Sequence, residues 1–401
     1  MGNKNGPVYR ARYESYTFSC LVVVEYVYFE LMNELVVKAE YKKTIRSTAI
    51  KDSFLNFKRG LHNTRLRSDR HFLDTITGNN GNNFQHPRYP IVLCHGLFGF
   101  DKIQFGPFNF LRSIEWLTRP PTRRNGGSIV IDYWGTIKRA LENNGCKVLT
   151  AKVPPLGDIE NRAKALNEYL TRNCKEFRTK EKYRSKNHDN MGNTEDMLSK
   201  SSNKLKVNLV AHSMGGLDCR YLISKLDHES YEVASLCTIS TPHRGSVLAD
   251  FVFDLTKKYP FLSKACPLSI KQLTTQNMAQ FNKEVRDDPN VAYFSFGAKF
   301  LPKWYNVFFI PWKIAKQKTL SLNTAYKDIH TEDNDGLVSV ESAKWGKYLG
   351  TLNLVDHLDL INWTNKLEIL ISKVTDRLNL NYFDATVLYL YVAKILAEEN
   401  C

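Results

Sequence analysis

The stretch Val207-Asn208-Leu209-Val210-Ala211-His212-Ser213-Met214-Gly215-Gly216 decides the fold of this chain. An apolar run leads to Ala211 and presents Ser213, and two glycines then lead into the apolar-periodic segment 217–226. Strand, sharp turn and helix in this order are the context of a nucleophile elbow, where a strained turn holds a serine oxygen clear of the backbone. Ala211 and Gly215 supply the small residues that the crossing of strand and helix requires, although Ala replaces the first glycine of the usual G-x-S-x-G pattern. The stretch alone also fits a glycine-rich turn with an incidental serine.

Strand and helix patterns alternate around this elbow. Buried or alternating apolar runs predict strands at 90–94, 147–153, 235–240 and 291–296. Helical spacing predicts helices at 132–144, 159–174 and 384–399. This order is typical of a mostly parallel central sheet flanked by helices, which is an α/β fold.

The chain divides into two parts. Residues 1–86 form a predicted N-terminal basic extension, partly disordered, in which 38–70 holds ten Lys or Arg and three acidic residues. Residues 87–401 form the predicted catalytic domain. Within it, 175–206 is charged and poor in apolar residues, which predicts a disordered surface insertion.

Charge and cysteine content bound the environment. The formal net charge is +15 and the sequence pI is about 9.3. Such a charge suits nucleic acid, an anionic membrane surface or import into a negative-inside organelle. No recognition motif favours nucleic acid, so we expect no nucleic-acid partner. The eight cysteines form no C-x-x-C pair, which favours free thiols in a reducing compartment.

A serine nucleophile needs an oxyanion hole, a base and an acid. The turn His95-Gly96-Leu97 follows a predicted strand, so the backbone amides of Leu97 and Met214 are the candidate oxyanion donors. His95 itself is more typical of a structural turn histidine. In the order Ser, acid, His, the best base is His357 with Asp335 as acid, and Asp333 is the closest competitor. The other histidines after the nucleophile are His228, His243 and His330.

Several motifs together resemble a known family. They are His95-Gly96-Leu97, 211–216, Thr241-Pro242-His243-Arg244-Gly245-Ser246, 334–338 and His357-Leu358-Asp359, in this order. They resemble the bacterial triacylglycerol lipases of the Burkholderia/Pseudomonas type. The likeness to fungal mitochondrial triacylglycerol lipases is closer and extends through 215–223, 302–307 and 356–363.

The resemblance covers 90–401 and implies an α/β-hydrolase fold with a lid or cap insertion. It also implies Ser213 as nucleophile, Asp335 as acid and His357 as base. The expected function is hydrolysis of long-chain acyl esters of triacylglycerol and diacylglycerol through an acyl-enzyme, without a cofactor. The bacterial relatives carry a structural calcium; Asp359 matches one of its ligands, but a second ligand has no match here, so the metal stays unknown. Phospholipase or acyltransferase activity would use the same triad, and a non-catalytic lipid-binding protein is the rival of another class.

Two apolar stretches and the basic segment predict where the protein acts. The amphipathic stretch 249–273 and the aromatic stretch 300–312 are either core or a cap over an apolar cleft. A cap flanked by lysines predicts contact with a lipid substrate at a membrane or droplet surface. The resemblance and the basic segment point to the mitochondrion, with cytoplasm or lipid droplet as alternatives. Met32 is an alternative start that would place the basic segment near the N-terminus.

Overall fold

The computed structural model describes residues 84–97, 102–105, 129–187, 204–263, 266–302, 306, 308–322, 333–363 and 383–401. Residues 1–83 of the expected extension and His330 therefore lie outside the described residues. Six strands form one fully parallel sheet in the order β4-β1-β5-β6-β7-β8. Their bounds are β1 Ile91–Cys94, β4 Val148–Thr150, β5 Leu205–His212, β6 Tyr231–Ile239, β7 Ala292–Lys299 and β8 Lys347–Asn353.

The central strands are apolar along most of their length because both faces of the sheet are covered. Successive side chains of a strand point to opposite faces. Ile91 and Leu93 accordingly pack in one buried cluster, whereas Val92 and Cys94 pack in another. The sheet thus separates two cores, and its position is fixed from both sides.

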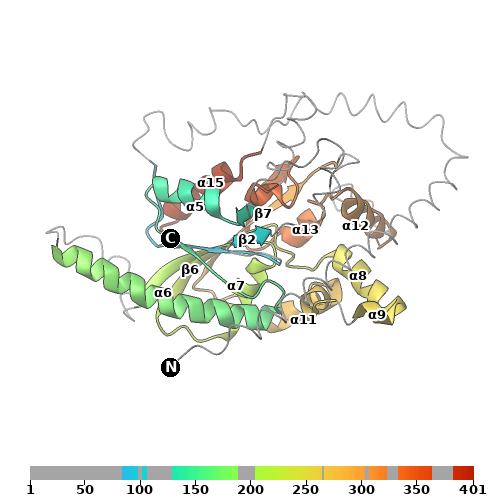
Figure 1. Ribbon diagram of the computed structural model, residues 1–401, viewed down its shortest axis with the longest axis horizontal. Helices are drawn as coiled ribbons and strands as arrows, with labels where there is room; N and C mark the ends of the chain where they lie inside the picture. Colours follow the sequence, from blue (N-terminus) through green and yellow to red (C-terminus); the bar gives the residue numbers. More distant parts are fainter. Residues whose placement is uncertain are drawn as a thin grey trace, which may run out of the picture.

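Helices cover the two faces in pairs (Figure 1). On one face, α5 (Gly135–Asn143) packs against α15 (Ala385–Glu398), and on the other α6 (Ile159–Asn187) packs against α7 (Gly215–Lys225). The remaining helices of the described residues are α8 Val247–Lys258, α9 Pro260–Ser263, α10 Leu268–Gln272, α11 Thr275–Glu284, α12 Phe309–Leu322, α13 Val340–Ala343 and the 3-10 turn η3 Asp359–Ile361. Within the described part of the chain, no helix is both long and apolar enough to cross a bilayer.

The strand order places a functional site. β1 has β4 on one side and β5 on the other, so the chain reverses its direction of winding between β1 and β5. In open parallel sheets, ligands bind beyond the carboxyl ends of the strands at such a switch point. Here those ends lead into His95 and Ser213. The predicted α/β-hydrolase fold is confirmed.

Two local predictions differ from the structure. α6 continues to Asn187, so 175–187 is helical rather than disordered; the rest of this stretch up to 203 lies outside the described residues. The charged residues there are good helix formers, and Phe177 anchors this part of the helix by packing against the core. The stretch 249–273 is not one helix but α8, α9 and α10, because Pro260 and Pro267 lie at the starts of new helices.

Other elements were not predicted. β8 carries few fully buried side chains, so its apolar signal is weak. A two-stranded antiparallel sheet joins β2 (Lys102–Phe105) to β3 (Ile129–Asp132), and its pairing spans residues far apart in the chain.

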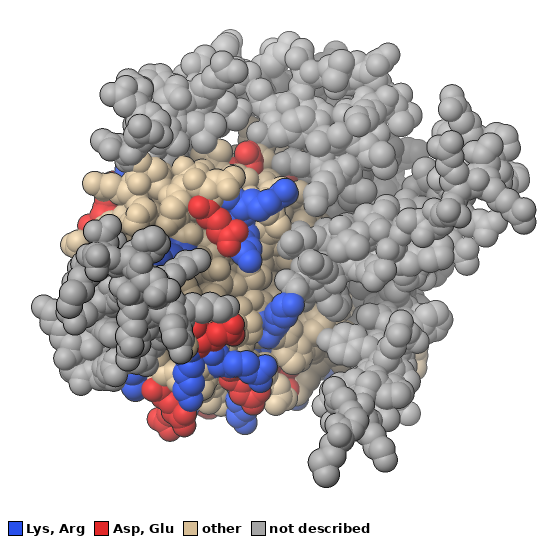
Figure 2. All heavy atoms as spheres, turned by 60° about the vertical axis from the view of Figure 1, so that its left-hand side comes forward, with Lys and Arg blue, Asp and Glu red and all other residues tan. Residues whose placement is uncertain are grey.

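Charges of both signs mix on one side of the domain. On the described part of the face in Figure 2, Lys and Arg side chains lie among Asp and Glu side chains and do not gather into a one-sign patch. A nucleic-acid footprint is a patch or stripe of basic residues. This face therefore gives no support to the nucleic-acid partner that the net charge alone would allow.

Candidate active site

Ser213 occupies a strained turn between β5 and α7. Its φ is 57°, a region that costs energy for a residue with a side chain. The surrounding backbone holds it there, since Ser213 N–H donates to Ile239 O (3.0 Å) and Ser213 O accepts from the Thr241 hydroxyl (2.7 Å). The predicted strand–turn–helix is present, and the turn that begins at Thr241 contacts it through this hydrogen bond.

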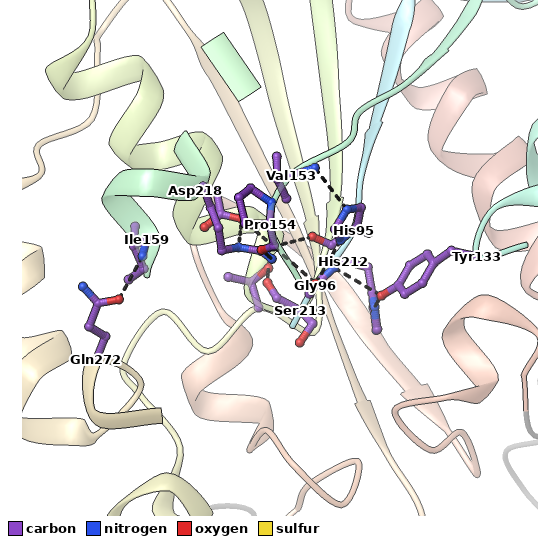
Figure 3. Close-up of polar contacts among 12 residues, drawn as sticks. His95, Gly96, Tyr133, Val153, Pro154, Ile159, His212, Ser213, Asp218 and Gln272 are labelled. Carbon is purple, nitrogen blue, oxygen red and sulfur yellow. Dashed lines mark hydrogen bonds and ion pairs between the residues drawn. The ribbon is translucent and has the colours of Figure 1, made fainter. Parts of the chain in front are cut away.

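Two glycines let the loop after β1 touch the elbow. A Cβ on Gly215 would lie 2.7 Å from His95 O, and one on Gly96 would lie 2.7 Å from Ser213 Cβ. Both distances are far shorter than a carbon contact allows. We name His95, Gly96 and Leu97 the oxyanion loop; Figure 3 shows His95 and Gly96 beside Ser213.

Arg162 on α6 orients the oxyanion loop through hydrogen bonds to its carbonyl oxygens. Its Nη2 donates to the carbonyl oxygens of His95 (2.8 Å) and Gly96 (3.3 Å). A trans peptide places the Leu97 N–H opposite to the Gly96 oxygen, so this amide points away from Arg162. Among the described residues, neither Leu97 N–H nor Met214 N–H donates to an acceptor. The two predicted oxyanion donors are therefore available, and Met214 stands at the N-terminus of α7, where the helix dipole favours an anion.

The arginine is itself held by a buried carboxylate. Asp218 Oδ2 on α7 lies 2.7 Å from Nη2 and 2.9 Å from Nε of Arg162, and both side chains are nearly inaccessible. Burial raises the pKa of Asp218 to about 6, and the neighbouring Arg162 acts in the opposite direction. The guanidinium of Arg162, at hydrogen-bond distance, stabilises the ionised form of this carboxyl. Sequence reasoning missed this pair; the available signal was a charged residue on the otherwise apolar stripe of each helix.

Asp335 and His357 are brought together by the loops after β7 and β8. Asp335 Oδ2 lies 2.7 Å from Nδ1 of His357, and Asp335 is fully buried. Its Oδ1 accepts the amides of Leu337 (3.0 Å) and Val338 (2.8 Å), so the carboxylate is fixed in one orientation. The competitor Asp333 is turned elsewhere and pairs with Lys299 at 2.5 Å.

The predicted base His357 packs against the residue that precedes the predicted nucleophile Ser213. The ring of His357 is 4.6 Å, centroid to centroid, from the ring of His212, which immediately precedes Ser213. No hydrogen bond joins Ser213 Oγ to His357 among the described residues. Catalytic hydrogen bonds of this type are often long in unliganded enzymes and tighten when substrate binds.

The other described histidines have structural partners. His95 Nδ1 lies 3.0 Å from Gly96 O, and its Nε2 lies 3.4 Å from Val153 N. His243 is buried, stacks on Trp345 and bonds to Thr238 at 3.0 Å. Burial lowers the pKa of His243 well below its usual value, and the nearby Arg220 lowers it further. These contacts favour structural roles, as expected for His95.

The acidic residues near His357 are engaged by the backbone. Asp359 Oδ2 accepts the amide of Asp356 (3.0 Å). Asp356 Oδ1 accepts the amides of Leu358 and Asp359. In the ranges that the structure describes, no three His, Cys, Asp or Glu side chains cluster in a way that could hold a metal ion.

Helices α8, α9, α10 and α12, which we call the cap, contact the loop that carries Asp335 through the residues directly before α8 and α12. Ser246, before α8, donates its hydroxyl to Leu337 O (2.6 Å). Phe308, before α12, packs closely on Gly336: a Cβ added to Gly336 would lie 2.7 Å from the Cβ of Phe308. α8 and α12 also pack on each other through Ile310, Ile314, Leu248, Phe251 and Phe309.

Comparison with known proteins places the chain in a family. It is 40% identical over 306 residues to "Triacylglycerol lipase 2" of Saccharomyces cerevisiae, a match that covers 71% of this chain and 83% of that protein. It is 26% identical over 309 residues to "Triacylglycerol lipase" of Vibrio cholerae, covering 70% and 81% respectively.

The other comparisons are more distant. A family described as "PGAP1-like alpha/beta domain" matches residues 188–283. Among solved structures, Staphylococcus hyicus lipase aligns with a TM-score of 0.44 and 17% identity, over 80% of this chain and 97% of that chain. The extent of the yeast match decides the assignment: this chain belongs to the triacylglycerol lipase family.

Proposed function

We propose that this protein is a serine lipase that hydrolyses long-chain acyl esters of triacylglycerol and diacylglycerol, with Ser213, His357 and Asp335 as its triad. The observation that carries the proposal is the buried Asp335–His357 hydrogen bond beside the strained Ser213 turn. Membership of the triacylglycerol lipase family supports the choice of substrate.

The geometry supports the following mechanism. Asp335 accepts a hydrogen bond from Nδ1–H of His357, which leaves the lone pair of Nε2 for the serine proton. Ser213 Oγ attacks the ester carbonyl carbon, its proton passes to Nε2, and the amides of Leu97 and Met214 bind the resulting oxyanion. The imidazolium then protonates the departing alcohol, leaving an acyl-enzyme. Water, deprotonated by His357, attacks the acyl-enzyme and releases the fatty acid.

The substrate test is hydrolysis of a defined mixture. Purified protein is incubated with triacylglycerol, diacylglycerol and phospholipids, and the products are measured by mass spectrometry. We expect loss of the two neutral glycerolipids with release of fatty acid. Preferential loss of phospholipid would indicate a phospholipase, and acyl transfer to added alcohol or lysolipid would indicate an acyltransferase. A failure of Ser213 to react with a fluorophosphonate probe would favour a non-catalytic lipid-binding protein.

The cap supplies a surface suited to lipid. Phe261 and Leu268 are 60% and 55% exposed. Lys257 lies 4.5 Å from the ring centre of Phe253, and Lys258 lies 5.0 Å from that of Tyr259. Lys313 and Lys316 on α12 lie over Phe309 and Trp312 in the same way. Rings that enter an interface beside ammonium groups fit an anionic lipid surface, so we propose that this cap docks there.

Reversing two of these charges tests the docking surface. The variant Lys257→Glu with Lys258→Glu should lower activity on anionic emulsions about tenfold or more, because each lysine near such a surface contributes about 1 kcal/mol. Raising the salt concentration should reduce the difference. Hydrolysis of a short soluble ester should stay within about twofold, since the triad is untouched.

The matched control carries Lys175→Glu with Lys225→Glu, two exposed lysines on α6 and α7 outside the cap. Its activity on anionic emulsions should equal that of the wild type. Equal losses in both variants, or an equal loss on the soluble ester, would contradict docking through the cap.

We further propose that the protein acts in the mitochondrion. The proposal is supported by the basic segment 38–70 and by the resemblance stated above. Tagged protein, produced both in full length and from Met32, should appear in mitochondrial fractions. Recovery of both forms only in cytosol or on lipid droplets would contradict it.

A further inference from the structure

A buried tyrosine hydroxyl connects the oxyanion loop to the residue before the nucleophile. Tyr133 follows β3 and is 5% exposed. Its Oη lies 3.2 Å from Gly96 N and 2.7 Å from Nδ1 of His212. Figure 3 shows Tyr133 and His212 joined in this way beside Ser213. Because an amide N–H can only donate, the hydroxyl accepts from Gly96 and still has a proton to donate to the imidazole.

The same imidazole packs against the base. His212 is 1% exposed, and its ring lies 4.6 Å from that of His357 at an angle of 42°. Burial lowers the pKa of His212 well below its usual value, and the nearness of His357 lowers it further. His212 is therefore neutral at physiological pH. A second cation at this distance would oppose the imidazolium that His357 must form when it takes the serine proton.

Tyr133 and Arg162 together hold the oxyanion loop through hydrogen bonds. Arg162 holds the carbonyl oxygens of His95 and Gly96, and Tyr133 holds the Gly96 N–H. With both neighbouring groups fixed, the peptide that carries the Leu97 amide has little freedom to rotate. The orientation of an oxyanion donor determines how well it stabilises the transition state.

We propose that Tyr133 and His212 form a positioning relay that fixes the oxyanion loop and the base His357 relative to each other. The relay rests on the proposed function, because it assigns no reaction of its own. Among the described residues, the Tyr133 hydroxyl bonds to neither Ser213 nor His357; it acts through Gly96 and His212. The relay stabilises the transition state and not the bound substrate. Its loss should therefore lower kcat and leave KM nearly unchanged.

Two buried tyrosines provide a matched test. Tyr133→Phe removes the relay hydroxyl but keeps the ring, whose centre lies 4.8 Å from that of Trp134. Tyr389→Phe is the control, because Tyr389 is equally buried, also contacts Trp134, and its hydroxyl has no hydrogen-bond partner among the described atoms. On a short soluble ester, Tyr133→Phe should lower kcat about 10- to 100-fold, less than the loss of an oxyanion donor itself, with KM within about twofold.

The imidazole is tested with a graded pair. His212→Asn can keep an acceptor near the position of Nδ1, whereas His212→Leu cannot. We expect the Asn variant to recover much of the kcat that the Leu variant loses. Combining His212→Leu with Tyr133→Phe should cost little more than the worse single change, because both break one unit. Additive losses, or equal losses in the Asn and Leu variants, would overturn the relay.

The labelling rate of Ser213 by a fluorophosphonate separates the two proposals. Tyr133→Phe should label more slowly than the wild type by a factor similar to its loss in kcat, with an unchanged melting temperature. A wild type that neither turns over esters nor labels would reject the lipase proposal itself. A wild type that reacts, with Tyr133→Phe as fast as Tyr389→Phe, would reject only the relay.

Discussion

Replacing Ser213 with alanine should reduce ester hydrolysis on the order of 10⁴-fold or more, because the variant lacks the hydroxyl that we propose forms the acyl-enzyme. The residual rate would come from substrate binding and the amides of the oxyanion hole. Pre-steady-state kinetics on a chromogenic ester checks this, since the burst of released alcohol should vanish.

The Ser213→Ala variant should keep nearly the stability of the wild type. The substitution removes one oxygen that makes no hydrogen bond to the described residues, while the positive φ is retained. The melting temperature should therefore change by no more than a few degrees. A burst that persists in the alanine variant would show that another residue is the nucleophile.

Replacing Asp335 with asparagine should lower kcat by about 10⁴-fold, because an amide no longer fixes the required tautomer of His357. The equivalent change at Asp333 is the matched control, as the two carboxylates are two residues apart. Asp333 pairs with a partly exposed Lys299, and such a pair contributes about 0–1 kcal/mol to stability. We expect Asp333→Asn to retain activity within about threefold, in line with so small an effect.

The comparison is made by measuring kcat and KM of both variants on the same soluble ester. A crippled Asp333→Asn with an active Asp335→Asn would reassign the acid. Similar moderate losses of kcat in both variants would indicate that the whole loop after β7, rather than one carboxylate, orients His357.

The parts of the site that could be predicted are those with local sequence signals. A strand, a small residue, Ser213 and Gly215 appear within a few positions, and this pattern requires the turn that the structure contains. Asp335, unlike Asp333, is followed directly by a glycine, which permits a tight turn and favours it as the acid. Gly336 does adopt a φ of 101° there.

The parts that could not be predicted depend on contacts between distant segments. Arg162 and Asp218 are 56 positions apart, and Tyr133 and His212 are 79 apart. A single charged or aromatic residue on a buried face does not reveal its partner before the sheet brings the two together. The predicted length of α6 was too short for a related reason. A charged composition is found in solvent-exposed helices as well as in disordered segments, so it does not distinguish the two.

The attachment of the cap to the acid loop has a mechanical consequence. Ser246, directly before α8, donates a hydrogen bond to Leu337, and Phe308, directly before α12, packs on Gly336. Both contacts are therefore made to the loop that follows Asp335. If the cap swings when it meets lipid, these two points act as its hinge, and displacement grows with distance from them. The tip around the exposed Phe261 would then travel farthest while the acid and base stay in register. Access to the serine could thereby open without disturbing the hydrogen bond on which its reactivity depends.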